Sequence, residues 1–255
     1  MNRSRLEAFS DGVFAVAATL LALDLTVAGP GHGLLASQLA DRWPAFVAYL
    51  ISFFTIGIIW VNHHSVMNNV AVVTRSLLFT NLVLLVVTVT IPFVTATLAD
   101  YLKQGGPNAS VAAALYAGVF ELMSISFALL FEWILRHDEC VRQPLPGPAK
   151  NSARLRFYFG QVPYLVAIGV AFVSPLAVVV ITGGVAIYYI FERAQPTPPA
   201  SAPSAEAELG AVSRGEAQLG ARPASRVAAI AVAAIAVACA SAAGRMPPRS
   251  CYRRR

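Results

Sequence analysis

The stretch "RLEAFSDGVFAVAATLLALDL", residues 5–25, decides how the chain is interpreted. Asp11 and Asp24 bracket an apolar run of only twelve residues, Gly12 to Leu23. Twelve helical residues cover about 18 Å, against a hydrocarbon core of about 30 Å. A helix that crosses a membrane here therefore holds carboxylates at membrane depth. Such groups almost always face the interior of a helix bundle or a watery path, not lipid.

The composition is that of an integral membrane protein. Of the 255 residues, 57% are hydrophobic and 13% are charged, against about 25% charged in a soluble domain. The net charge of +6 is expected to report orientation and lipid contact, not nucleic acid. The three cysteines share no metal or disulfide spacing. No nucleophile–base or metal motif is present, so we expect neither an enzyme nor a cofactor.

Six apolar segments predict an all-α protein with six transmembrane helices. They lie near residues 6–28, 44–67, 76–99, 109–135, 156–173 and 175–192. Nine basic residues then fall on the side of the N-terminus and two on the other side. The nine are Arg3, Arg5, Arg75, Arg136, Arg142, Lys150, Arg154, Arg156 and Arg193, and the two are Arg42 and Lys103. The positive-inside rule therefore places both ends of the six-helix unit in the cytoplasm.

The chain is expected to divide into three parts. Residues 1–193 form the transmembrane domain, and residues 194–226 form a linker rich in Pro, Ala and Ser that should be disordered. Residues 227–255 carry an Ala-rich segment and a basic C-terminal tail. A seventh span at 227–243 is the alternative, but it would place the final arginines outside, against the charge rule.

Asp11 has two possible roles. It could cap a helix that starts at Gly12. Alternatively, the helix begins before residue 6, because Arg5, Phe9, Gly12 and Val16 share one helical face. Asp11 then lies on the flank of this helix and needs partners on neighbouring helices. Candidate partners at the same membrane boundary are Trp60, His63, His64 and Asn81. The two histidines could instead be an interfacial polar cap.

Val16, Thr19 and Leu23 project on one side of the first helix. An ordinary packing stripe is the simpler interpretation of this spacing. Gly12, Ala15, Ala18 and Ala22 allow close approach of another helix. Glu121 is a second acid inside a span, and it is either a proton or ion site or the partner in an interhelical hydrogen bond.

The motif RxxxFSD, formed by Arg5, Phe9, Ser10 and Asp11, is where the chain resembles a known family. It resembles the first-helix signature of the prokaryotic transmembrane protein 175 family, which is similar to the lysosomal potassium channel of animals. Further residues fit the pattern of the family. They are Pro44, Tyr49, Ser52, Phe53, Trp60, His63, His64, Asn81, Pro92 and Phe93.

The resemblance implies a homotetramer of six-helix subunits in the cytoplasmic membrane, with no P-loop and no carbonyl filter. It implies that the first helix of each subunit lines the pore, with Val16, Thr19 and Leu23 at the constriction. The implied function is a potassium-favouring cation leak channel, with potassium as the permeant ion and membrane lipid as a partner. A proton-conducting channel or proton-coupled carrier that uses Asp11, Glu121 and His63 or His64 is the alternative.

Overall fold

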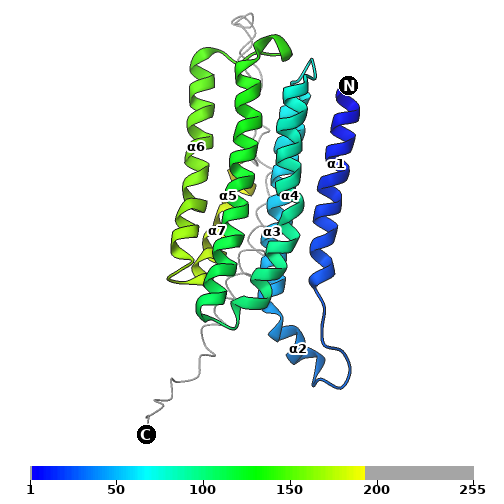
Figure 1. Ribbon diagram of the computed structural model, residues 1–255, viewed down its shortest axis with the longest axis vertical. Helices are drawn as coiled ribbons and strands as arrows, with labels where there is room; N and C mark the ends of the chain where they lie inside the picture. The colour runs from blue at the N-terminus through cyan, green and yellow to red at the C-terminus, as the bar shows by residue number, and fades with distance from the viewer. Residues whose placement is uncertain (1, 193–255) are drawn as a thin grey trace, which may run out of the picture. The chain divides into compact units, whose positions relative to one another are not determined.

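The computed structural model describes residues 2–192, and within this range the chain is helical with no strand (Figure 1). The long helices are α1 (Arg3–Leu20), α3 (Trp43–Asn68), α4 (Arg75–Leu102), α5 (Gly106–Arg136), α6 (Gly147–Val170) and α7 (Pro175–Glu192). The short elements are η1 (Leu21–Asp24), α2 (Leu35–Asp41) and η2 (Asp138–Cys140). The all-α fold class is confirmed. The predicted linker and tail lie outside the described residues.

Four stretches are long and apolar enough to cross a membrane. They are Arg3–Asp24, Trp43–Asn68, Arg75–Leu102 and Gly106–Arg136. The apolar part of α7, Pro175–Phe191, is shorter. The chain is therefore a multi-pass membrane protein. A helix overlaps each of the six predicted segments, while the count of six transmembrane helices and the domain boundaries stay predictions.

The first helix begins earlier and ends earlier than its predicted range of 6–28. Asn2 caps α1, because its side chain accepts a hydrogen bond from the backbone N–H of Ser4 at 3.4 Å. Asp11 therefore lies inside the helix and does not cap it. Beyond Asp24 the chain leaves the helix, and Arg42 donates to the carbonyl oxygen of Thr26 at 2.7 Å. The Thr26 carbonyl is thus bonded to the residue that precedes α3, and it does not take part in a continuation of α1.

Two further differences concern the other segments. The short helix α2 was not predicted, because its seven residues are too few to show a clear period. Helix α6 starts at Gly147, nine residues before the predicted start at 156, with a proline in its first turn. Pro92 lies inside α4, which continues to Leu102.

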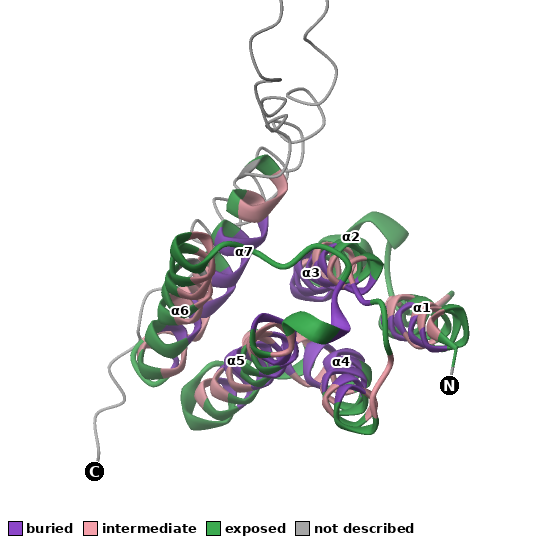
Figure 2. Cartoon of the chain, turned by 90° about the horizontal axis from the view of Figure 1, so that it is seen from above, coloured by how far each residue is buried: buried purple, intermediate pink, exposed green. Residues whose placement is uncertain are grey.

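Helix packing places α1 beside α3 and α4, and α5 between α4 and α6 (Figure 2). A cluster of hydroxyl groups joins the middle of this packing. Ser52 of α3 bonds to Thr95 of α4 at 2.8 Å and to Tyr116 of α5 at 3.0 Å. All three side chains are buried. The cluster satisfies polar groups among helices, as a membrane interior requires.

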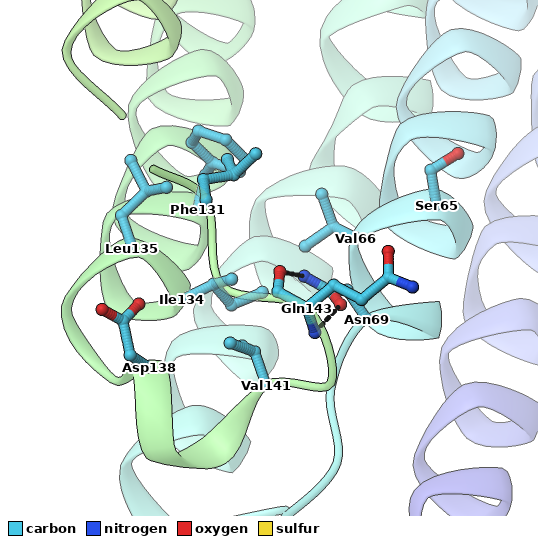
Figure 3. A pocket seen from close by; sticks show the side chains of 10 residues that line it. Ser65, Val66, Asn69, Phe131, Ile134, Leu135, Asp138, Val141 and Gln143 are labelled. Atoms are coloured by element: carbon cyan, nitrogen blue, oxygen red, sulfur yellow. Dashed lines mark hydrogen bonds between the residues drawn. The ribbon is translucent and has the colours of Figure 1, made fainter. Parts of the chain in front are cut away.

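Two connections at one end of the bundle are joined to each other. The α3–α4 connection pairs with the segment after η2 through an antiparallel bridge between Val70 and Val141. The Asn69 amide exchanges two hydrogen bonds with the backbone of Gln143, at 3.1 and 3.0 Å (Figure 3). We call this bridge and the Asn69–Gln143 pair the loop staple. It fixes the ends of α3 and α5 against each other.

Candidate pore helix and its supporting network

Helix α1 has one buried face and one exposed face. The buried positions are Leu6, Ser10, Phe14 and Ala17, followed by Leu21 of η1. This spacing follows the helical repeat and places the face against α3 and α4. In Figure 2 the buried side of α1 faces these two helices, and its outer side is exposed. The outer face has no partner within residues 2–192.

The three predicted constriction residues all lie on exposed positions. Val16 is 54% exposed, Leu23 is 69% exposed, and Thr19 is also exposed. Val16 and Thr19 lie on α1 proper, whereas Leu23 lies in the 3₁₀ turn η1. Gly12 lies on the same side, and a Cβ atom built there would meet nothing within 4 Å. These residues do not pack against other helices of the same subunit. The interpretation that they form an ordinary packing stripe therefore does not apply within a single chain.

Ser10, Asn81 and His63 form one hydrogen-bonded chain behind α1. The Nε2 atom of His63 lies 2.7 Å from Oδ1 of Asn81, and Nδ2 of Asn81 donates to Oγ of Ser10 at 3.0 Å. Ser10 donates in turn to the carbonyl oxygen of Leu6 at 2.9 Å. Ser10 and Asn81 are fully buried and His63 is 1% exposed. The chain links α1, α3 and α4, and each of its contacts joins a donor to an acceptor.

Asp11 is held separately from this chain. Its Oδ1 atom accepts a hydrogen bond from Nε1 of Trp60, on α3, at 2.9 Å. Asp11 is half-buried, while Trp60 is 43% exposed. The ring of His64 lies 6.4 Å from the Trp60 ring. The carboxylate therefore finds its partner on a neighbouring helix and not on α1 itself.

The remaining motif residues are not brought into the network. Arg5 and Phe9 lie on the exposed side of α1, and Phe9 is 53% exposed. His64 is exposed as well. Of the predicted set, the structure thus joins Ser10 to Asn81 and His63, and Asp11 to Trp60. Arg5, Phe9 and His64 remain on the surface of the single chain.

Two contributors were not identified from the sequence. Phe14 is buried at the centre of α1, and its ring lies 5.3 Å from the ring of His63. The backbone carbonyl of Leu6 ends the hydrogen-bonded chain. Phe14 could have been found from its position four residues after Ser10, on the same helical face. A backbone acceptor leaves no such signal in the sequence.

Glu121 lies on α5 and is 5% exposed. Its Oε2 atom has no hydrogen-bond partner among the described residues, and the same holds for Oδ1 of Asn62 on α3. An interhelical hydrogen bond that satisfies the whole Glu121 carboxylate is therefore not formed within residues 2–192. A proton or ion site at Glu121 stays a prediction.

Comparison with known proteins identifies relatives of this chain in sequence and in structure. The family model described as endosomal/lysosomal potassium channel TMEM175 matches residues 5–92. A potassium channel of Streptomyces collinus is 43% identical over 207 residues, which cover 80% of this chain and 100% of that protein. The crystal structure of a lysosomal potassium-selective channel TMEM175 homologue from Chamaesiphon minutus superposes with a TM-score of 0.65 at 35% identity. It covers 76% of this chain and 98% of that one.

An animal relative matches a shorter part. The human endosomal/lysosomal proton channel TMEM175 is 41% identical over 86 residues, which cover 30% of this chain and 17% of the human protein. The family model covers α1, α3 and the first part of α4, the elements that carry the exposed face and the network behind it. The Streptomyces protein matches over its whole length. This chain belongs to the TMEM175 family.

Proposed function

We propose that the chain is a potassium-favouring cation channel, in which four copies of α1 line the pore of a homotetramer. Ions move down their gradient without covalent chemistry. Val16, Thr19 and Leu23 form the narrow part, and the apolar rings of Val16 and Leu23 act as a barrier of size and dehydration. The observation that carries this proposal is the unpartnered outer face of α1. The names of the Streptomyces and Chamaesiphon relatives, both potassium channels, support the choice of ion.

The composition of the outer face favours a subunit contact over lipid. Besides Val16 and Leu23, its exposed positions include the small residues Ala8, Gly12 and Ala15. Lipid does not require small side chains, whereas a closely packed helix does. The apolar run between Asp11 and Asp24 is also too short to match the hydrocarbon core by itself. Neighbouring subunits that shield α1 from lipid would remove both difficulties.

Thr19 adds a polar ring to an otherwise apolar pore. Its hydroxyl donates to the carbonyl oxygen of Val16 at 2.9 Å. Because the proton is used in this bond, the lone pairs of the oxygen remain available on an exposed side chain. Oxygen lone pairs are the ligands that replace the water around an alkali cation. Four Thr19 oxygens would thus offer partial coordination between the Val16 and Leu23 rings.

The network behind α1 is proposed to hold the pore face in register. Ser10, Asn81 and His63 fix the buried face, and the Trp60–Asp11 bond fixes the flank. We also propose the cell membrane as the location, with both termini cytoplasmic. The excess of basic residues on the N-terminal side supports this orientation.

The test is ion flux from the purified full-length protein in liposomes. Under bi-ionic conditions, with potassium on one side and sodium on the other, a potassium-favouring channel sets a reversal potential toward the potassium equilibrium value. A proton-sensitive dye inside the vesicles is read at the same time. Absence of potassium current from correctly reconstituted protein would overturn the proposal.

Proton conduction is the second candidate. It is favoured by the buried Glu121 carboxylate with its unpartnered oxygen and by the name of the human relative. The same vesicles separate the two functions. A proton channel acidifies or alkalinises the lumen along an imposed voltage when potassium is replaced by an impermeant cation. Glu121→Gln would abolish that flux if Glu121 carries the proton, and would leave potassium current unchanged.

A further inference from the structure

A polar cavity of about 470 Å³ lies at the end of the bundle where α1 begins. Three chain segments line it: the start of α1 with its cap, the α3–α4 connection, and the connection between η2 and α6. The lining residues are Asn2, Arg3, Ser4, Ala71, Val72, Val73 and Arg142. Pockets that bind small molecules have volumes of about 300–1,000 Å³, and the volume of this cavity falls within that range.

The described residues neutralise the positive charge of the cavity only in part. Arg3 has one acidic neighbour, Glu7, at 3.5 Å. Arg142 is exposed and forms no ion pair within residues 2–192. Arg75, two residues beyond Val73, lies over the Phe79 ring at 5.7 Å and also has no acidic partner in that range. A group that enters this cavity is therefore attracted if it is anionic.

Arg3 is held through its side chain, and Arg142 through its backbone, before any ligand binds. The Nη1 atom of Arg3 donates to the carbonyl oxygen of Asn68 at 2.9 Å, which ties it to the end of α3. The backbone N–H of Arg142 donates to the carbonyl oxygen of Asn69 at 2.8 Å. Arg142 lies between Val141 and Gln143, both held by the loop staple (Figure 3). The backbone that carries Arg142 is thus already ordered, and a ligand does not need to order it on binding.

The chemistry of two arginines points to phosphate. The guanidinium fork matches phosphate oxygens with paired, charge-assisted hydrogen bonds. Basic pockets between transmembrane helices at the membrane boundary bind phospholipid headgroups. The apolar side chains of Val72 and Val73 line the same cavity, and Val72 is 54% exposed. They offer a surface for the non-polar part of such a ligand.

We propose that this cavity binds a phosphate-bearing anion between Arg3 and Arg142, either the headgroup of an anionic phospholipid or a soluble phosphate compound. The bound group joins the first turn of α1 to the loop staple. It thereby stabilises α1 at the end opposite the connection between η1 and α2. This inference concerns binding, and it stands whether or not the chain conducts potassium.

The experiment measures thermal unfolding of the full-length protein in a neutral detergent. The probes are short-chain phosphatidylglycerol, short-chain phosphatidylcholine and inorganic phosphate, each titrated at low and high salt. We expect saturable stabilisation by an anionic probe, weakened by salt because the charges are solvent-accessible. In Arg142→Gln the apparent affinity should fall by about tenfold, as expected when one hydrogen bond between charged groups is lost.

Arg136→Gln is the matched control. Arg136 is an exposed arginine on the C-terminal turn of α5 that pairs with Glu132, and it does not line the cavity. Stabilisation by phosphatidylglycerol alone supports the lipid source, and equal stabilisation by phosphate supports the soluble source. The proposal is overturned if no anionic probe stabilises the protein, if phosphatidylcholine acts equally well, or if Arg136→Gln weakens binding as much as Arg142→Gln. Arg3→Gln, if it folds, should repeat the loss.

Discussion

The indole N–H of Trp60 donates to the Asp11 carboxylate over 2.9 Å, and this bond joins the flank of α1 to α3. On a regular helix Asp11 is turned by about 140° from Val16. The carboxylate thus lies away from the proposed ion path and close to the helix that supports it. Its contact explains how an acid is accommodated in a span whose apolar run covers only Gly12 to Leu23.

The Asp11–Trp60 bond predicts a structural role for Asp11. Asp11→Asn keeps an oxygen acceptor for Trp60, so selectivity between potassium and sodium should not change. Asp11→Ala removes the acceptor and should lower the free energy of unfolding by about 0.6 kcal/mol, the average measured for hydrogen bonds between membrane helices, and by no more than about 1.7 kcal/mol, the maximum. Denaturant unfolding in detergent measures this loss, and Trp60→Phe should cost a similar amount. A strong selectivity change in well-folded Asp11→Asn protein would contradict the prediction.

The Ser10–Asn81–His63 chain predicts energetic coupling among its members. Asn81→Ala removes the partner of the buried His63 ring, while Ser10 keeps its bond to the Leu6 carbonyl. This substitution should destabilise the protein more than Ser10→Ala does, because a buried polar group is left unpaired. A double-mutant cycle with these two substitutions should give a coupling energy of about 0.5–3 kcal/mol. Strictly additive effects would show that the 3.0 Å contact between Asn81 and Ser10 contributes little.

The outer face of α1 predicts where the barrier to ions lies. Val16→Ala and Leu23→Ala should each raise cation flux and weaken discrimination, because a smaller side chain widens a hydrophobic constriction. Val86→Ala is the matched control, since Val86 lies on α4 and is 64% exposed. It should conduct like the parent. If Val16→Ala and Leu23→Ala also conduct like the parent, the pore lies elsewhere.

The C-terminal part of the chain is predicted to be dispensable for conduction. Truncation after Arg193 should leave ion selectivity unchanged, because the exposed face of α1 and its supporting network lie wholly within residues 3–81. Reversal potentials of the truncated protein measure this. An impermeant thiol label on Cys251 tests the predicted cytoplasmic tail, and reaction from outside intact cells would show a seventh span.

The sequence predicts the long helices well. A membrane helix makes its backbone hydrogen bonds within one segment, so each span is recognisable as one continuous apolar run. Trp43–Asn68 and Pro175–Glu192 agree with their predicted ranges within one residue at each end. The end of α1 was not predictable. The chain beyond it is held by Arg42, which lies sixteen residues from Thr26 and donates to that carbonyl, and a contact of this kind leaves no local pattern.

For the candidate site, polar residues inside apolar segments were the useful signal. Ser10, Asp11, Trp60, His63 and Asn81 could be named because each is unusual at its depth. How they pair could not be predicted, since the rotation of each helix about its axis depends on packing. The same limit applies to the loop staple, where ordinary residues such as Asn69 and Gln143 meet only after the helices have packed.

The connections at one end of the bundle are paired through their backbones, whereas, within residues 2–192, the connection between η1 and α2 is not. This difference decides where foreign sequence can be introduced. The connection between η1 and α2 passes through Gly31 at φ +91°, with Gly31 and His32 both exposed. An epitope or fluorophore-binding peptide inserted there separates no backbone–backbone hydrogen bond among the described residues. An insertion between Asn69 and Val72 would instead separate the bonds that Ala71 and Val72 make to Cys140. Gly31–His32 is therefore the better insertion point of the two connections.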